Sequence, residues 1–190
     1  MGYYKTEDNL NMGMQINYYG PFLLTCLLIP LLKSSAPSKI INVSSLLHYF
    51  GEVDFDNLNM ERYWSDHLVY SNSKLFLNLM TLELSNKLKG SGITVNCLHP
   101  GVSATNIVHE IPYKFIRTLI LVLYKYLFKS AWEAVQTTVF LAVSPEVRHV
   151  SGKYFADCRE VRPSKKSLDA NVAKRLWTES EELVKFRLEM

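Results

Sequence analysis

The sequence predicts an α/β fold in which helices cover both faces of a parallel sheet. Three observations lead to this class. Short β-rich runs alternate with helical stretches along the chain, which is the pattern of βαβ units. An apolar share of 48% with 21% charged residues suits one buried core. No repeat, low-complexity tract or Gly-, Ser- or Pro-rich linker marks a boundary, so we expect residues 1–190 to form a single domain.

Each element is predicted by its own local pattern. The first helical stretch ends at the breaker Ser34-Ser-Ala-Pro37, and a short β-rich run follows it. In a later helical stretch Leu75, Leu79 and Leu82 share one face, and Gly90-Ser-Gly92 supplies the stop. In order, the expected elements are a helix near 15–33, a strand at 39–44, a helix at 71–89, a strand at 93–98, a helix near 131–143, a strand at 153–156 and a helix at about 168–186.

Candidate catalytic residues follow the predicted strands. In parallel sheets, ligands bind at the carboxyl ends of the strands. The first strand ends at Ser44-Ser45, the second ends at His99-Pro-Gly101, and between them Tyr70 and Lys74 begin a helix. Since residues four apart share a helix face, the ammonium of Lys74 can favour the phenolate form of Tyr70. A hydroxyl such as that of Ser45 can then hold a substrate carbonyl oxygen beside the tyrosine.

Each of these residues also has a structural explanation. In a chain with this many tyrosines and lysines, roughly one Tyr-x-x-x-Lys pair is expected by chance, so the pair alone is weak evidence. Asn17 can bond to local backbone, Ser44 and Ser45 can form a turn, and Thr105 can be a helix N-cap. What favours catalysis is the order in which these residues occur along the chain.

That order resembles a known family. Four segments are similar to successive signatures of short-chain dehydrogenases/reductases: Asn17-Tyr-Tyr-Gly-Pro-Phe-Leu-Leu-Thr25, Ile41-Asn-Val-Ser-Ser45, Tyr70-Ser-Asn-Ser-Lys74 and His99-Pro-Gly-Val-Ser103. Two later segments, Ser151–Cys158 and Arg175-Leu-Trp177, resemble its retinol dehydrogenase branch. The resemblance covers essentially the whole chain. It implies a Rossmann-type doubly wound sheet and a nicotinamide-dependent oxidoreductase.

The resemblance implies a role for each matching residue. Tyr70 would be the catalytic acid/base, and Lys74 would assist it and contact the nicotinamide ribose. Ser45 would orient the substrate oxygen, and Asn17 would hold a water in the proton relay. The turn after the second strand would face the nicotinamide, with Thr105 a candidate for its carboxamide. The implied cofactor-binding set is Tyr70, Lys74, Pro100, Gly101, Val102 and Thr105.

One signature of the family is missing. A dinucleotide fold needs closely spaced glycines after its first strand, so that backbone amides can approach the pyrophosphate. The eight glycines of this chain form no such cluster, and the Asn-Asn-Ala-Gly segment that closes the family's fourth strand is not found either. We therefore expect the C-terminal part of a Rossmann-type doubly wound parallel sheet, N-terminally truncated, with the first strands and the glycine-rich loop missing. Alone, such a chain is expected to neither bind dinucleotide tightly nor catalyse.

Two apolar stretches bear on membrane contact. Pro21–Leu32 is short for a membrane span and contains a proline, which favours a buried helix. Ile111–Phe128 is long enough but carries Lys114, Arg117 and Lys125, which are costly at mid-bilayer. For this second stretch we prefer an amphipathic surface helix that touches lipid. The polar N-terminus offers no cleavable signal peptide.

The remaining composition excludes several classes of function. The three cysteines are far apart and odd in number, which suits free thiols in a reducing compartment better than disulfides or a zinc site. His109-Glu110 begin an HExxH motif, but residue 113 is tyrosine, so no metal site is expected. A net charge of +3 with one short basic cluster gives little reason to expect nucleic-acid binding.

The first functional hypothesis is hydride transfer between NADP(H), with NAD(H) as the alternative, and an apolar alcohol or aldehyde such as a retinoid or fatty aldehyde. Residues 103–129 would form the substrate-loop region. The resemblance also implies an intracellular location at the endoplasmic reticulum or another membrane, and leaves membrane-surface contact and a homo-oligomer open. The rivals are a non-catalytic truncated remnant acting at most as an interaction partner, and a lipid-surface module built on 111–128. An upstream exon encoding Thr-Gly-x-x-x-Gly-x-Gly would favour a clipped enzyme over a remnant.

Overall fold

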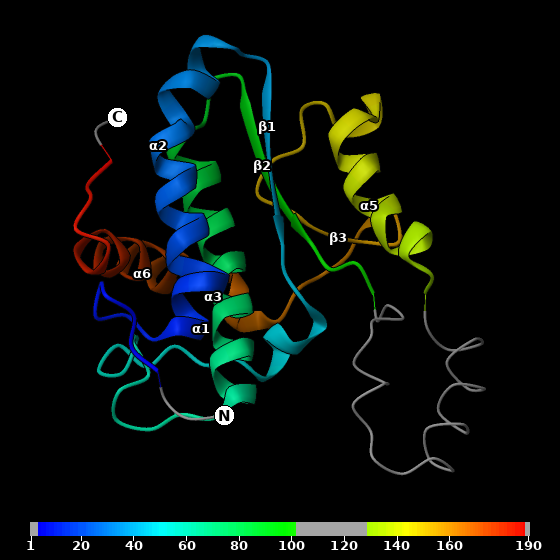
Figure 1. Ribbon diagram of the computed structural model, residues 1–190. Helices are drawn as coiled ribbons and strands as arrows, with labels where there is room; N and C mark the ends of the chain where they lie inside the picture. Colours follow the sequence, from blue (N-terminus) through cyan, green and yellow to red (C-terminus); the bar gives the residue numbers. More distant parts are fainter. Residues whose placement is uncertain (1–3, 102–128, 189–190) are drawn as a thin grey trace, which may run out of the picture.

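The computed structural model describes residues 4–101 and 129–188, and Figure 1 traces the elements in order. They are α1 (Met12–Met14), η1 (Gln15–Tyr19), α2 (Gly20–Ser34), β1 (Ser38–Val43), η2 (Leu46–Phe50), α3 (Asp66–Lys87), β2 (Ile93–Leu98), α5 (Ala131–Val143), η4 (Pro145–Val147), β3 (Tyr154–Ala156), β4 (Arg159–Glu160), η5 (Lys165–Leu168) and α6 (Ala170–Leu183). Every helix and strand expected from the sequence within these residues is present.

The sheet has the order β1-β2-β3-β4 and lies between two helical layers. The strands β1, β2 and β3 run parallel, with Ser38 opposite Ile93 and Cys97 opposite Tyr154. Helices α2 and α3 lie on one side of the sheet and α5 lies on the other (Figure 1). This confirms the predicted α/β class. One detail differs: β4 is antiparallel to β3, because Asp157 and Cys158 reverse the chain in a tight turn with positive φ at both residues.

Helix α3 carries the tyrosine and lysine and begins earlier than the sequence suggested. Ser65 is its N-cap, with a side chain that accepts a hydrogen bond from the Leu68 amide. The helix starts at Asp66 rather than at Ser71, so Tyr70 and Lys74 both lie inside regular helix. The shared face assumed for this pair therefore exists.

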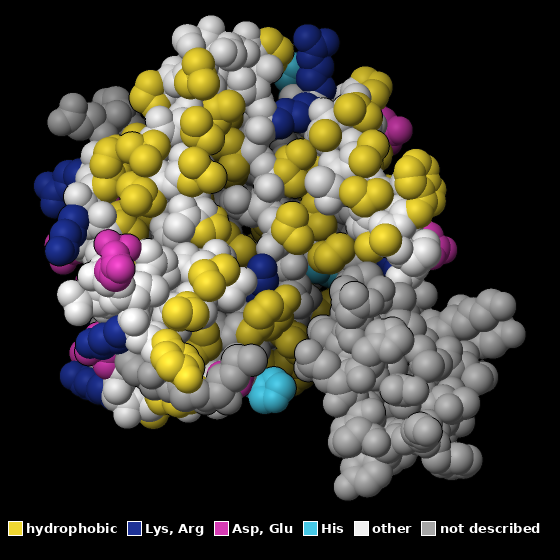
Figure 2. All heavy atoms as spheres, in the orientation of Figure 1, with side chains coloured by type: hydrophobic (Ala, Val, Ile, Leu, Met, Phe, Trp, Pro, Cys, Tyr) yellow, Lys and Arg dark blue, Asp and Glu magenta, His cyan; other side chains and the backbone are white. Residues whose placement is uncertain are grey.

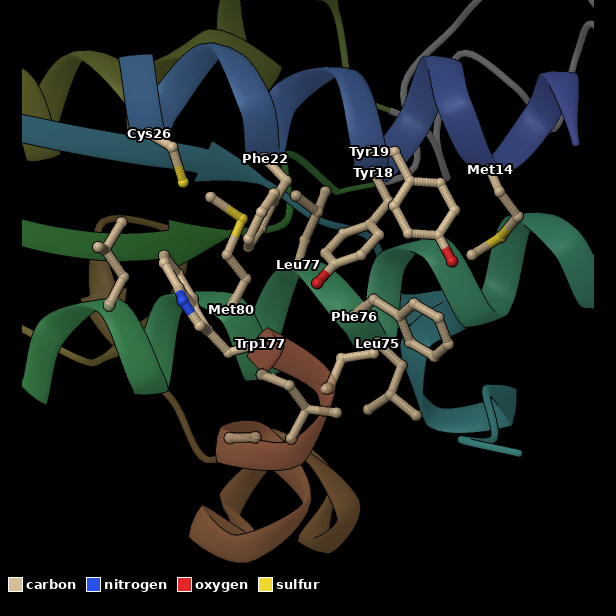
Figure 3. Packing of buried hydrophobic residues seen from close by; sticks show 14 of the residues in the cluster. Met14, Tyr18, Tyr19, Phe22, Cys26, Leu75, Phe76, Leu77, Met80 and Trp177 are labelled. Atoms are coloured by element: carbon tan, nitrogen blue, oxygen red, sulfur yellow. The ribbon is translucent and has the colours of Figure 1, made fainter. Parts of the chain in front are cut away.

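The main core lies where α1, η1 and α2 pack on α3 and α6 (Figure 3). The ring of Tyr18 lies edge-on to that of Phe76, with centroids 5.2 Å apart, and its hydroxyl is 2.8 Å from Ser180 Oγ. The rings of Phe22 and Trp177 lie 4.7 Å apart. These contacts join α6 to η1 and α2, so elements from both ends of the chain contribute to one core.

Helix α2 is apolar on two faces, although the sequence suggested a buried helix. One face carries Phe22, Cys26 and Ile29, which are buried in the core. Four leucines point outward and are at least two-fifths exposed: Leu24, Leu27, Leu28 and Leu31. By length and composition alone, Met12–Ser34 is apolar enough to cross a membrane, but its inner face serves the core of this domain. Figure 2 shows further hydrophobic side chains over α5, on the same side of the molecule.

Candidate active site

The carboxyl ends of the three parallel strands are joined by backbone hydrogen bonds. The Ser44 amide donates to the Leu98 carbonyl at 2.7 Å, just beyond β1. The His99 amide donates to the Phe155 carbonyl at 3.1 Å, just beyond β2. The segments that follow β1 and β2 therefore start side by side, as the sequence predicted.

Lys74 is bonded to the end of β1 in two ways. Its ammonium donates to the Val43 carbonyl at 3.1 Å, and its own carbonyl accepts from Ser44 Oγ at 3.0 Å. The ammonium also lies over the Tyr70 ring, 5.4 Å from the centroid. Burial lowers the pKa of Lys74 from its usual range, since the charged form loses hydration. The structure thus brings Tyr70 and Lys74 together and joins Lys74 to Ser44, the neighbour of Ser45.

Ser45 follows directly and begins the short helix η2. Its backbone is extended, and its Oγ accepts a hydrogen bond from the Leu47 amide at 3.2 Å. A hydroxyl that accepts through oxygen still has its proton to donate. Ser45 is therefore both the turn former that the structural explanation expected and a donor available to a substrate oxygen.

Asn17 is oriented by its own helix. Its side-chain amide nitrogen donates to the Gly13 carbonyl at 2.9 Å. The sequence had left such a bond to the local backbone open as the alternative to a catalytic role. Asn17 sits in η1, a π-helical turn in which the Gly20 amide bonds to the Gln15 carbonyl. Such turns often occur at functional sites. The bond to Gly13 does not join Asn17 to Ser45, Tyr70 or Lys74, so its role in a proton relay stays a prediction.

The turn after β2 is described only at its beginning. Gly101 has φ +87°, and its amide donates to His99 Nδ1 at 3.1 Å. A side chain at this position would meet the Lys129 side chain, which itself forms an ion pair with Asp157. Pro100 and Gly101 therefore lie at the carboxyl end of β2, as expected. Val102 and Thr105, with the rest of the substrate-loop region up to 128, lie outside the described residues.

His48 is a further residue of the site that the sequence patterns did not indicate. Its side chain is fully buried beside the serine pair, with Nδ1 2.7 Å from the Ser45 carbonyl and Nε2 accepting from the Ser164 amide at 3.1 Å. Burial is the main reason that the pKa of His48 is lowered. In the sequence, only the spacing of His48, three residues after Ser45, pointed to this contact. That spacing brings the ring to the Ser45 carbonyl because the turn is a 3₁₀ helix.

The larger hollows of the described surface lie away from this site. One, of about 610 Å³, is lined by residues such as Asp8, Phe55 and Glu182. Another of about 610 Å³ lies between the second half of α3 and the β3–β4 hairpin. Neither is lined by Ser45, Tyr70 or Lys74. Within the part of the chain that the structure describes, these two hollows are therefore separate from the candidate site.

Fold and site together define a doubly wound α/β domain with serine, tyrosine and lysine at the carboxyl ends of its strands, a class that includes nicotinamide-dependent oxidoreductases. The comparison with known families then makes the assignment specific. The short chain dehydrogenase family matches residues 4–114, which is more than half of the chain. This chain belongs to that family.

The chain is also similar to several curated proteins. Retinol dehydrogenase 14 from Homo sapiens is 45% identical over 183 residues, covering 96% of this chain and 54% of the relative. Retinol dehydrogenase 13 from Mus musculus is 46% identical over 186 residues, covering 96% and 56%. Retinol dehydrogenase 12 from Bos taurus is 36% identical over 187 residues, covering 98% and 58%. The chain thus spans a little over half the length of the curated relatives it matches.

A solved structure supports the fold. The crystal structure of an uncharacterized protein from Mycobacterium paratuberculosis superposes with a TM-score of 0.76 at 26% sequence identity. The alignment covers all of this chain and 65% of that one. The similarity extends over the whole described architecture, including the strand ends that carry the candidate site.

Proposed function

We propose that this chain carries the catalytic part of an NAD(P)-dependent oxidoreductase that interconverts an apolar alcohol and its aldehyde. The observation that carries the proposal is the position of Lys74. Its two hydrogen bonds join helix α3 to Val43 and Ser44 at the end of β1, next to Ser45, where this fold class binds ligands. The similarity to retinol dehydrogenases supports an apolar substrate, such as a retinoid or fatty aldehyde.

The proposed chemistry follows from the side chains. In aldehyde reduction, the Ser45 hydroxyl donates a hydrogen bond to the carbonyl oxygen, and the Tyr70 hydroxyl delivers a proton to that oxygen as it becomes an alkoxide. The Lys74 ammonium stabilises the phenolate that remains. In alcohol oxidation the same groups act in reverse. The nicotinamide cofactor supplies or accepts the hydride when it is bound.

The chain fits one end of such a cofactor and not the other. Lys74 is bonded to the carboxyl end of β1, and Gly101 lies just beyond the carboxyl end of β2. These residues can receive a nicotinamide and its ribose. For the pyrophosphate, the sequence offers no glycine cluster. We favour NADP(H) over NAD(H), on the basis of the retinol dehydrogenase resemblance alone.

The central test replaces the proposed proton donor. We suggest joining this chain behind the N-terminal part of human retinol dehydrogenase 14 that precedes the matched region, so that a complete cofactor site is present. Tyr70→Phe should lower kcat at least about 100-fold while leaving the cofactor Kd nearly unchanged, because it removes the proton-transfer group and little bulk. Tyr63→Phe, an exposed tyrosine outside the site, is the matched control. Retention of more than about a tenth of the activity in Tyr70→Phe would contradict the proposed role.

Substrate choice is proposed to depend on residues 103–129. This segment follows the turn that would face the nicotinamide, and the sequence places apolar residues along it. Exchanging it for the segment of retinol dehydrogenase 13 should change the ranking of kcat/KM among short and long aldehydes. An unchanged ranking would refute the assignment. The same apolar segment is the proposed site of contact with the endoplasmic reticulum or another membrane.

A non-catalytic role in protein interaction is the second candidate. It is favoured by the exposed apolar faces of α2 and α5 beside β1, which is the edge strand of the described sheet. The N-terminal part of a relative, expressed separately, distinguishes the two functions. Binding with restored turnover would support the enzyme, and binding without turnover would support the interaction role.

A further inference from the structure

His48 links the proposed catalytic serine to a distant part of the chain. We call residues 44–51 the serine turn and residues 159–168 the C-terminal segment. More than a hundred positions separate them in sequence, yet the ring of His48 bonds to both. Its Nδ1 lies 2.7 Å from the Ser45 carbonyl in the serine turn. Its Nε2 lies 3.1 Å from the Ser164 amide in the C-terminal segment.

These two bonds determine where the ring proton lies. A backbone amide can only donate, so Nε2 must accept from Ser164 and carry no proton. In the neutral ring the proton is then on Nδ1, where it donates to the Ser45 carbonyl at 2.7 Å, with the Tyr154 hydroxyl as a more distant partner at 3.4 Å. A doubly protonated ring would have a donor at Nε2 facing the Ser164 donor. The linkage therefore requires the neutral ring.

The surroundings keep the ring neutral and in place. The Tyr49 ring lies 4.3 Å from the His48 ring, and the Tyr154 ring lies 5.0 Å away on β3. Tyr154 in turn stacks on His99 at 5.8 Å. Burial is the largest cause of the lowered pKa of His48. The hydrogen bond with the Ser45 carbonyl raises this pKa, and the neighbouring His99 lowers it further. From η5, the Lys166 ammonium donates to the Gly51 carbonyl, adding a cation near the turn.

Two further bonds join the same segments without touching Ser45. The Tyr49 hydroxyl donates to the Arg162 carbonyl at 2.9 Å, and Lys166 Nζ donates to the Gly51 carbonyl at 2.9 Å. The attachment of the segments to one another is therefore shared by three side chains. The attachment of the Ser45 backbone to the C-terminal segment goes through His48.

We propose that His48 is a positioning residue of the candidate active site, whose neutral ring holds the Ser45 backbone against the C-terminal segment and so sets, together with the Leu47 amide, the direction of the Ser45 hydroxyl. The role of the serine rests on the proposed function; the linkage itself does not. His48 touches neither substrate nor cofactor in this proposal. It acts through Ser45 alone.

The experiment uses the isotope-labelled 190-residue chain and two near-isosteric variants. His48→Asn keeps a donor near the Nδ1 position, and His48→Gln keeps an acceptor near the Nε2 position. In the wild type, ring ¹H–¹⁵N spectra should show a proton on Nδ1 and none on Nε2. His48→Asn should speed exchange of the Ser164 amide about tenfold, roughly the effect of one lost hydrogen bond. His48→Gln should keep Ser164 protected but replace the single Ser45 χ1 rotamer by an averaged one.

Tyr49→Phe is the matched control, because it removes a bond between the same two segments and leaves His48 intact. It should alter neither the Ser45 rotamer nor the exchange of Ser164. Acidifying the wild type gives a second measurement that needs no variant: Ser164 should lose protection as the ring of His48 takes up its second proton. A proton on Nε2, or a Ser45 rotamer that is unchanged in His48→Gln, would overturn the proposal. Failure of Tyr70→Phe to reduce turnover would instead overturn the proposed function and leave these results standing.

Discussion

Lys74 shows how one residue can serve both structure and chemistry. Its ammonium is bonded to the Val43 carbonyl and lies over the Tyr70 ring, and its carbonyl receives the Ser44 hydroxyl. Removing the side chain would leave the Val43 carbonyl without this partner as well as removing a charge from the site. An alanine here is therefore expected to damage both stability and activity, which makes Tyr70→Phe the cleaner probe of catalysis.

Two histidines near the site, the buried His48 and the half-buried His99, predict a pH dependence of stability. Burial lowers the pKa of His48 and of His99 below the usual 6.5, so the unfolded chain takes up protons before the folded chain does. Below about pH 6.5 the unfolded state then binds more protons, and the free energy of unfolding should fall as the pH falls. Above that pH these residues should contribute no slope.

Urea unfolding midpoints between about pH 8 and about pH 5 would measure this effect. His48→Asn should flatten the slope at acidic pH. His67→Gln, which alters an exposed histidine on α3, should leave it unchanged. A wild-type midpoint that rises on acidification would contradict the assignment of neutral buried rings.

Among the elements, helix α5 has the most complete N-terminal cap. Ser130 Oγ accepts from the Glu133 amide, and the Glu133 carboxylate accepts from the Ser130 amide at 2.8 Å. This capping box also lowers the pKa of Glu133. It sits next to Lys129, whose side chain lies against Gly101, so α5 begins beside the turn that follows β2.

Ser130→Ala should lower the free energy of unfolding by about 1 kcal/mol, the usual effect of losing an N-cap side chain. Thermal or urea denaturation of the purified chain would measure it. Ser130→Asp supplies another good N-cap and should recover most of the loss. Equal losses in both variants would show that the serine acts by something other than capping.

The elements also show why sequence patterns succeeded in some places and failed in others. The runs Ser38–Val43 and Ile93–Leu98 were predictable because they are β-rich and bounded by breakers. Tyr70 and Lys74 were predictable because helical spacing depends only on local geometry. His48 was not, since its importance depends on Ser164, which a distant segment brings into contact. The antiparallel β4 was not either, since two residues give no periodic pattern.

The whole molecule presents one side that is unusually apolar for a protein surface. Strand β1 is the edge of the described sheet, and exposed hydrophobic side chains of α2 and α5 flank it (Figure 2). An edge strand with unpaired backbone groups and apolar neighbours favours association with other chains. We therefore expect this side of the described residues to be where the chain associates with other chains.

The 190-residue chain alone should bind dinucleotide weakly and show no turnover. A nicotinamide can meet Lys74 and Gly101, but without glycines at the pyrophosphate the remote binding energy that orients it for hydride transfer is lost. Calorimetry with NADP(H) and NAD(H) on monodisperse protein would measure this. The joined protein described above is the positive control. Micromolar binding accompanied by turnover would show that the glycine cluster is dispensable.

The π turn η1 has a further consequence for the tolerance of this chain to deletions. An α-helix advances about 100° per residue, so side chains spaced four apart drift around it by about 40° at each step. Met14, Tyr18, Phe22 and Cys26 have this spacing and are all buried, because the wider π turn between the first two cancels part of the drift. Loss of a single residue from 15–19 would convert the turn to ordinary helix without breaking it. Because a π turn takes about one residue more than an α-turn for the same rotation, the helix would survive with Met14 still facing the core, so this short stretch should accept a one-residue deletion better than the regular helix that follows it.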